Sequence, residues 1–409
     1  MKTAVTRVGR IAAGLSVLCA PLAGYFASAA QQTQPLDARR TAPSSSCAIV
    51  SDKGQPVAAG GREVYCVIDI GSRNVKLVVS STQPDNTMTL RDERSCRARL
   101  DLGTKVYDAG APAGRQDRPL LAADIEALAS VMQEYQALCA LDRGKMMGAD
   151  ATEWARHATN MAEIKQALAA KTGITIDVLT PDQEARYGYA AATRGRPGYL
   201  VVDAGSNSFQ ITSQPQGREA PQGVSVPLGY EQASNLYFLK AASYEAGRRS
   251  YADEVRRRVS ATSLDLAGLR AVIASGKLGR RMVALGQDAA IQLIVGGALR
   301  DASGEWLRDE LAYSRKSRQV HATELPEYGE VTAVLSAAQI GEYLHSLRGS
   351  SQWLQLRTDP IRAIYGNKAL VVPALFDELM RELGVDSVVL TPAEMPAGYV
   401  LAKARSGPR

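Results

Sequence analysis

The chain has 409 residues, of which 45% are hydrophobic and 22% are charged, and its formal net charge is +6. The length and composition predict a folded protein with a sizeable core and two or three domains of about 150 residues each. No stretch after the first 30 residues has the about 20 apolar residues that a membrane-spanning helix needs. The positive charge is also too small to indicate a nucleic-acid-binding protein.

Residues 1–30 have the layout of a secretory signal peptide. Three basic residues precede an uncharged segment that ends in small residues, and we expect cleavage near Ala29 or Ala30. Loss of the three basic residues lowers the formal net charge to about +3. An uncleaved membrane anchor is the alternative. We expect a periplasmic or secreted protein that is not inserted in the membrane after cleavage.

Residues 31–60 are rich in Gln, Pro, Ser, Ala and Gly and lack hydrophobic periodicity, which predicts a flexible tether. The cysteines after the signal peptide are Cys47, Cys66, Cys96 and Cys139. In an oxidising compartment they permit two disulfides in three pairings, although Cys66 in its apolar strand is equally compatible with a buried thiol. The cysteine spacing and the three histidines indicate neither a zinc site nor a redox dithiol.

Predicted strands and helices alternate along the rest of the chain. In the first half we expect strands at 65–70, 75–81, 144–152 and 174–180, and helices at 121–141, 160–173 and 181–195. In the second half we expect a hairpin at 198–214, helices at 230–247, 251–263 and 374–384, and strands at 291–297, 368–373 and 386–391. This alternation predicts an α/β fold with mixed sheets flanked by helices.

Two hairpins share the pattern strand, Asp-x-Gly-Ser, turn, strand. They are "YCVIDIGSRNVKLVVSS" (65–81) and "YLVVDAGSNSFQITS" (199–213), with Asp69 and Asp203 at the strand ends. Glycine lets a backbone approach a phosphate closely, serines add donors, and a carboxylate can hold a divalent cation. The repeat therefore predicts two similar domains with both turns facing a shared cleft, and it indicates phosphoryl chemistry.

These hairpins and later segments resemble the exopolyphosphatase and guanosine pentaphosphate phosphohydrolase (Ppx/GppA-type) family, in the actin, Hsp70 and sugar-kinase superfamily. The resemblance runs from about Val64 to Ala402 and includes "ATEWARHATN", "TPDQEARYGY", "VPLGYEQ", "IVGGALRD" and "KALVVPALFDELMRELGVDSVVLTPAEMPAGYV". It implies two ribonuclease-H-like (actin-like) domains with the active site in the cleft between them. The expected boundaries are 61–188 for domain I, 189–402 for domain II with the C-terminal elements, and 403–409 for a tail.

The resemblance also implies roles for individual residues. Glu184 would be the catalytic base that activates water, with Asp203 and the residue at Gln210 completing the catalytic set. Asp69 and Asp203 would position Mg²⁺. Phosphate-binding residues would be Gly71, Ser72, Arg73, Arg156, Gly205, Ser206, Asn207, Ser208, Gly296 and Gly297. A helix N-terminus by itself also favours an acid, by about 0.3–1 kcal/mol, so Glu184 has a purely structural alternative.

Both turns depart from the family pattern. Gln210 stands in place of a glutamate and cannot take a proton, and positioned acid–base groups contribute roughly 10²–10⁴-fold in rate. Ser206 and Asn207 replace glycines and restrict the second turn. In the first turn, Arg73 replaces an asparagine, where it either adds a phosphate contact or fills the space that the substrate needs.

Three functions are compatible with the sequence. The first is an exported Mg²⁺-dependent phosphatase that acts on polyphosphate, since export separates the protein from cytoplasmic guanosine pentaphosphate. The second is a protein that binds polyphosphate or another anion without turnover. The third is a phosphotransferase with an adenosine pocket around Gly296 and Gly297. We expect no nucleic-acid partner, and a homodimer is left open.

A basic cluster in the second half is the last feature of interest. It comprises Arg248, Arg249, Arg256, Arg257, Arg258, Lys277, Arg280 and Arg281. The cluster is either a patch for a polyanion or a solvated helix face.

Overall fold

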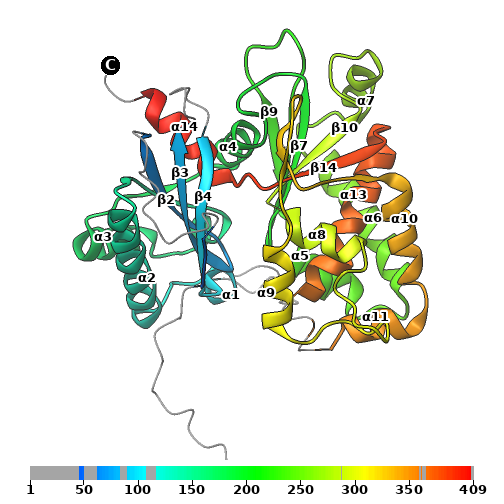
Figure 1. Cartoon of the computed structure of the whole chain (residues 1–409), viewed down its shortest axis with the longest axis horizontal. Helices are drawn as coiled ribbons and strands as arrows, with labels where there is room; N and C mark the ends of the chain where they lie inside the picture. The colour runs from blue at the N-terminus through cyan, green and yellow to red at the C-terminus, as the bar shows by residue number, and fades with distance from the viewer. Residues whose placement is uncertain are drawn as a thin grey trace, which may run out of the picture. The chain divides into compact units, whose positions relative to one another are not determined.

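The computed structural model describes residues 46–49, 62–82, 90–106, 117–286, 288–358, 361 and 365–406. The predicted signal peptide and most of the predicted tether lie outside these residues. Two six-stranded sheets with flanking helices make up the described part of the chain (Figure 1). The predicted α/β class with mixed sheets is therefore confirmed.

The first sheet has the strand order β1-β4-β3-β2-β5-β6. Its strands are β1 (Ser46–Ile49), β2 (Val64–Ile70), β3 (Asn74–Thr82), β4 (Leu90–Arg99), β5 (Lys145–Ala151) and β6 (Ile176–Val178). Neighbours from β1 to β2 pair antiparallel, whereas β5 pairs parallel with both β2 and β6. The sheet is thus an antiparallel meander extended by two parallel strands.

The second sheet repeats this arrangement, in the order β13-β14-β10-β7-β8-β9. Its strands are β7 (Tyr199–Ala204), β8 (Phe209–Gln214), β9 (Gln222–Val226), β10 (Arg281–Leu285), β13 (Ala333–Ser336) and β14 (Ser387–Thr391). The meander β7–β8–β9 corresponds to β2–β3–β4, and the parallel strands β10 and β14 correspond to β5 and β6. The repeated hairpin therefore opens the same topological unit twice, with Asp69 and Asp203 in equivalent places.

Helices cover the sheets. Those before β7 are α1 (Leu102–Val106), α2 (Ala122–Leu141), the 3₁₀ turn η1 (Glu153–Arg156), α3 (Met161–Thr172) and α4 (Pro181–Thr193). Those after β9 are α5 (Tyr230–Ala233), the π-helical η2 (Ser234–Phe238), α6 (Tyr244–Ser260), α7 (Leu266–Ala274), α8 (Asp288–Val295), α9 (Glu310–Arg318), α10 (Ala337–Ser346), α11 (Ser350–Leu356), α13 (Asn367–Leu383) and α14 (Met395–Ser406). A small ribbon of β11 (Thr323–Leu325) and β12 (Gly329–Val331) lies outside the two sheets. No helix in these residues is long and apolar enough to cross a bilayer.

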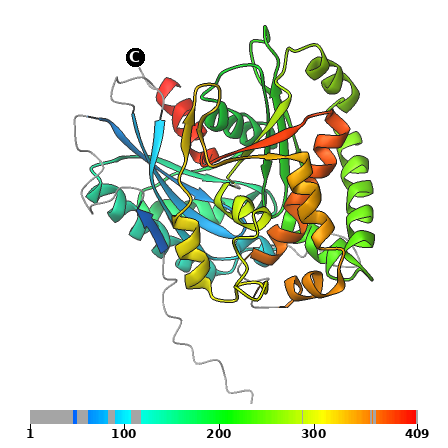
Figure 2. The same cartoon turned by 45° about the vertical axis from the view of Figure 1, so that its right-hand side comes forward.

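Helices α4 and α14 pack against each other between the two sheets (Figures 1 and 2). The C-terminal helix α14 contacts β2 and β5 of the first sheet, while α4 contacts β8 and β9 of the second. The Tyr399 hydroxyl of α14 donates a hydrogen bond of 2.8 Å to Asp177 of β6. Each helix thus packs against a strand that flanks one of the two turns.

Two strand predictions are wrong. Residues 291–297 fall on α8 and its C-terminal end, and residues 368–373 open α13, which continues through Pro373 to Leu383. Both runs are short and continuously apolar, and such a run does not distinguish a buried strand from a buried helix. The other predicted elements are present, but the helices expected at 230–247 and 251–263 are divided differently. Residues 230–238 form α5 and the π-helical η2, and α6 runs from Tyr244 to Ser260 through the expected gap at 248–250.

A disulfide joins Cys66 of β2 to Cys139 of α2. Both residues are buried. Cys96 is also disulfide-bonded, and the β1–β4 register sets its Cα opposite that of Cys47. Of the two alternatives for Cys66, the structure has the disulfide rather than a free thiol.

Candidate active site

A cavity of about 140 Å³ lies between the ends of β2 and β7, and most of the predicted site residues line it. They are Asp69, Gly71, Ser72, Arg73, Glu184, Asp203, Gly205, Ser206, Asn207 and Ser208. Because a single water needs only about 10–15 Å³, the cavity has room for a small anion together with water. The two Asp-x-Gly-Ser turns therefore meet at one site.

Loop 1 is the turn between β2 and β3. The Gly71 amide donates a hydrogen bond of 3.0 Å to the Asn74 carbonyl and closes the turn. The carbonyls of Ser72 and Arg73 accept hydrogen bonds from backbone amides at the junction of β4 and α1. The Arg73 side chain pairs with Glu231 of α5. Loop 1 is thus fixed through its carbonyls, and its arginine already has a carboxylate partner.

Loop 2 is the turn between β7 and β8. A Cβ atom at Gly205 would lie 2.7 Å from the Ser208 carbonyl oxygen, so a side chain does not fit there. Ser206 and Asn207 stand in place of the glycines of the family pattern, but neither has a positive φ. The carbonyls of Gly205 and Ser206 accept hydrogen bonds of 3.0 Å from the first amides of α5. The two replacements therefore cause no backbone strain.

The cross-strand partners of the two aspartates differ. Asp69 pairs in register with Lys76, whose Nζ lies 3.2 Å from the carboxylate. Asp203 pairs in register with Gln210, which is buried and does not line the cavity. The Gln210 Nε2 instead donates hydrogen bonds of 3.0 Å to the hydroxyls of Ser208 and Ser225. No described residue donates to the Asp203 carboxylate, and the role that the resemblance assigns to Gln210 gains no support from its position.

The geometry of the first turn of α4 directs the side chain of Glu184 toward the cavity. Thr180 is the N-cap, and its hydroxyl accepts from the Gln183 amide while the Gln183 side chain accepts from the Thr180 amide. This capping box holds Gln183 on the exposed side of the first turn. The next residue, Glu184, is buried and faces the cavity.

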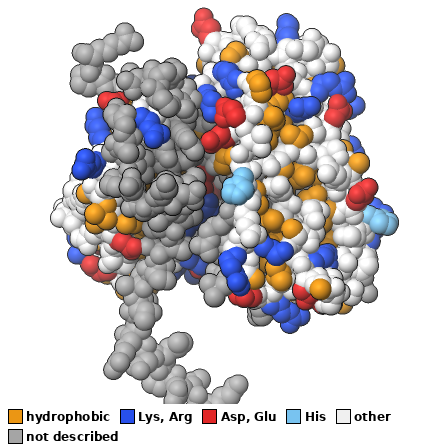
Figure 3. Space-filling view, in the orientation of Figure 1, with side chains coloured by type: hydrophobic (Ala, Val, Ile, Leu, Met, Phe, Trp, Pro, Cys, Tyr) orange, Lys and Arg blue, Asp and Glu red, His pale blue; other side chains and the backbone are white. Residues whose placement is uncertain are grey.

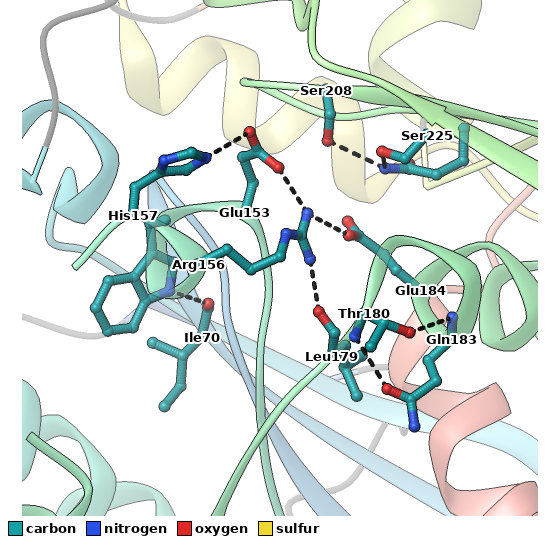
Figure 4. A network of polar contacts seen from close by, with 12 residues as sticks. Ile70, Glu153, Arg156, His157, Leu179, Thr180, Gln183, Glu184, Ser208 and Ser225 are labelled. Atoms are coloured by element: carbon teal, nitrogen blue, oxygen red, sulfur yellow. Dashed lines mark hydrogen bonds and ion pairs between the residues drawn. The ribbon is translucent and has the colours of Figure 1, made fainter. Parts of the chain in front are cut away.

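Arg156 holds Glu184 in place (Figure 4). Its Nη2 donates to Glu184 at 3.0 Å and to Glu153 at 2.6 Å, and its Nη1 donates to the Leu179 carbonyl at 2.7 Å. The second oxygen of Glu153 lies 3.3 Å from Nε2 of His157. Arg156 is therefore a neighbour of the cavity that orients a carboxylate, and it reaches a phosphate only through a change in these contacts.

Buried carboxylates dominate the electrostatics of the site. Burial raises the pKa of Glu184 to about 7, although Arg156 opposes the change. Burial likewise raises the pKa of Asp203 to about 7 and also raises the pKa of Asp69. Fully buried Asp150, the register partner of Asp69 on β5, has a raised pKa for the same reason. The carboxylates of this site therefore cannot all be ionised at neutral pH without a large electrostatic cost, and a bound cation lowers that cost.

Asp203→Asn is expected to stabilise the ligand-free protein at pH 8 by about 1–2 kcal/mol. Each unit by which folding raises the pKa costs about 1.4 kcal/mol of stability when the carboxylate is ionised, and the partial exposure of this carboxylate to the cavity reduces that cost. Because the pKa of Asp203 is higher in the folded protein than in the unfolded chain, the contribution of this group to stability is complete below pH 4 and is lost as the pH rises through about 7. The gain should therefore shrink between pH 8 and pH 5. Urea unfolding in EDTA measures it, and Asp253→Asn on α6, an exposed site, controls for net charge. A destabilised Asp203→Asn protein at pH 8 would contradict the burial argument.

The expected Mg²⁺ site is compatible with the side chains present. No three His, Cys, Asp or Glu side chains within the described ranges lie close enough together to hold a metal ion. Mg²⁺, however, usually binds one or two carboxylates and completes its shell with water and substrate phosphate. Asp203 borders the cavity with no described donor on its carboxylate, and Asp69 shares its own with Lys76. Asp203 fits the role better than Asp69.

Gly296 and Gly297, which the resemblance assigns to phosphate binding, lie outside the cavity. They follow the last residue of α8, and Gly297 has a φ of 69°, the left-handed conformation that commonly ends a helix. At the end of β10, Leu285 and Gly286 line the cavity instead. The structure therefore does not bring these two glycines to the cavity, and their assignment to phosphate binding gains no support from their position.

Several lining residues were not singled out from the sequence. They are Lys76, Arg97, Thr152, Glu153, Tyr230, Gly286, Lys368 and Glu394. A lysine within the apolar strand 75–81 was a usable signal for Lys76. Glu394 and Lys368 come from segments far along the chain, and only the fold brings them to the cavity.

The basic cluster of the second half is largely paired with acids. Arg248 contacts Glu245 and Asp377, while Arg257 and Arg258 share Glu254. Arg256 and Arg280 pair with Glu378 and Asp386. Basic and acidic side chains are interspersed over the face seen in Figure 3. These contacts favour the solvated-face interpretation over a polyanion patch.

Comparison with known proteins agrees with the geometry. Residues 96–285 match the model of the Ppx/GppA phosphatase family. The solved structure of the Aquifex aeolicus Ppx/GppA family member is 19% identical, with a TM-score of 0.59 over 85% of this chain and 99% of that one. An exopolyphosphatase from Cytophaga hutchinsonii is 14% identical, with a TM-score of 0.58 over 85% of this chain and 99% of that one.

The structural likenesses show the fold, and the family model covers loop 2, Glu184 and Arg156 within residues 96–285. The expected two-sheet architecture is thus confirmed, and the family match over residues 96–285 agrees with the resemblance. Residues 96–285 of this chain are thus similar to the Ppx/GppA phosphatase family, and the chain has the fold of the solved structure of a member of that family.

Proposed function

We propose that this protein is an exported Mg²⁺-dependent hydrolase that releases terminal phosphate from inorganic polyphosphate. The observation that carries the proposal is the convergence of both Asp-x-Gly-Ser turns and Glu184 on one cavity. Among the similar solved structures are an exopolyphosphatase and an exopolyphosphatase-like protein, which supports this substrate class. The Cys66–Cys139 disulfide supports export, because such bonds persist in oxidising compartments.

In the proposed reaction, the turns hold the terminal phosphoryl group and Glu184 activates water. The serine hydroxyls and backbone amides of loops 1 and 2 supply donors to phosphoryl oxygens, which is the main task in phosphoryl transfer. Glu184, with a pKa of about 7, accepts the proton of the attacking water near neutral pH. Arg156 and Glu153 keep its carboxylate turned to the cavity.

Bound Mg²⁺, held by Asp203 with Asp69, would neutralise charge on the phosphoryl oxygens. Lys76 and Arg97, which also line the cavity, add fixed positive charge. Together these groups offset the surplus of carboxylates and let a polyanion enter.

A second candidate, an anion-binding protein without turnover, is favoured by one specific observation. Gln210 is turned toward Ser208 and Ser225 and leaves the cavity without a carboxylate at that position. A phosphotransferase has less support, since the glycines expected to form its adenosine pocket lie outside the cavity.

The test is orthophosphate release from long-chain polyphosphate with Mg²⁺, for mature protein and its Glu184→Ala variant. Release by the wild type that disappears in the variant and in EDTA supports the hydrolase. If neither protein releases phosphate while both retain polyphosphate in a pull-down, the hydrolase is ruled out and the binding protein stands.

A further inference from the structure

The carboxylate of Glu394 forms ion pairs with two basic side chains that line the cavity. Its Oε2 lies 3.0 Å from Nζ of Lys76, and its Oε1 pairs with Nη2 of Arg97. Glu394 is buried and precedes α14 directly. All three residues line the cavity.

The two cations form a fixed pair on the first sheet. Lys76 of β3 and Arg97 of β4 are register partners, so their side chains leave the same face of the sheet side by side. Glu394 arrives from the other end of the chain, after the last strand of the second sheet. The carboxylate therefore bridges the two sheets at the cavity wall.

A carboxylate between an ammonium and a guanidinium makes the charge-assisted contacts that a phosphoryl group would make in its place. Burial raises the pKa of Glu394, but Lys76 and Arg97 outweigh burial and lower it to about 2. The group is therefore ionised at every pH at which the protein would work. Lys76 also contacts Asp69, so its charge is shared between two carboxylates before any ligand arrives.

We propose that Glu394 is a built-in competitor of phosphate ligands, which must displace it from Lys76 and Arg97 to bind. This inference rests on the proposed function only in taking phosphoryl groups as the ligands. The displacement costs the same for any ligand, and a chain of several phosphates regains more contacts than a single phosphate. Glu394 thus weakens the binding of every phosphate ligand, and only a ligand with several phosphates regains enough contacts to bind tightly in spite of it.

The experiment is calorimetric titration with inorganic phosphate and with tripolyphosphate, at fixed ionic strength, in a Glu184→Ala background that prevents hydrolysis. Glu394→Gln keeps the shape and removes the charge. Because the displacement cost is common to both ligands, we expect its affinities for inorganic phosphate and for tripolyphosphate to rise by a similar factor, about tenfold or more. Glu378→Gln is the matched control, because Glu378 is a buried glutamate paired with Arg256 and Arg381 outside the cavity.

Unchanged or weaker phosphate binding by folded Glu394→Gln would overturn the inference, as would an equal gain in the Glu378→Gln control. If Glu394→Gln does not fold, Lys76→Gln provides the test. The inference requires Lys76 to contact the bound phosphate, so this variant should bind inorganic phosphate more weakly. An unchanged Kd for inorganic phosphate would reject the inference. Absence of binding by every variant and by the parent protein would count against the proposed function as well. The two failures are therefore distinguishable.

Discussion

Glu184→Gln is expected to slow phosphate release by about 10²–10⁴-fold while leaving tripolyphosphate binding within a few-fold of the wild type. The amide has nearly the same shape and still accepts a hydrogen bond from Arg156, but it takes no proton from water. Measurement of kcat at saturating polyphosphate together with a calorimetric Kd separates the two effects. Glu163→Gln is the matched control, as an exposed glutamate in the first turn of α3.

The pH dependence of the rate of phosphate release is a second test of the role of Glu184. A base acts only when deprotonated, and burial raises the pKa of Glu184 to about 7. The rate should therefore be low at pH 5, rise through pH 7 and level off above it. In Glu184→Gln this acid limb should be absent from whatever activity is left. A wild-type rate that is flat between pH 5 and pH 8 would remove Glu184 from the role of base.

The sequence predicted the parts of this protein that depend on local pattern. Two apolar strands with the same Asp-x-Gly-Ser turn indicated a duplicated unit, and the register of both hairpins bears out this duplication. The Thr180–Gln183 capping box lies where the proline-led helix was expected. Such features need only a few neighbouring residues, so the sequence carries them in full.

The elements and contacts that were missed depend on tertiary structure. The run at 368–373 is a buried helix because α13 is enclosed by other helices, and its apolar composition alone does not reveal that. Residues 291–297 form the last part of a helix and two exposed glycines after it, and their apolar composition fits a buried strand equally well. Glu394 reaches Lys76 only because α14 returns to the first sheet after the second is complete.

The disulfide makes the largest stability prediction. Cys66 and Cys139 are 73 positions apart, and a crosslink of this kind typically contributes about 2–4 kcal/mol by restricting the unfolded chain. The Cys66→Ala/Cys139→Ala protein is therefore expected to lose about that much free energy of unfolding in urea.

The position of the bond extends this prediction to the active site. Cys66 lies on β2, the strand that carries Asp69, and Cys139 lies on α2, which packs against β2, β3 and β5. We expect the double variant to lose activity at a lower temperature than the wild type while keeping its rate at 10 °C, because the crosslink acts on the stability of the sheet rather than on the chemistry. Reductant should lower the stability of the wild type at least as much, since Cys96 is disulfide-bonded too. Equal unfolding midpoints for oxidised wild type and double variant would show that the first sheet holds loop 1 without the crosslink.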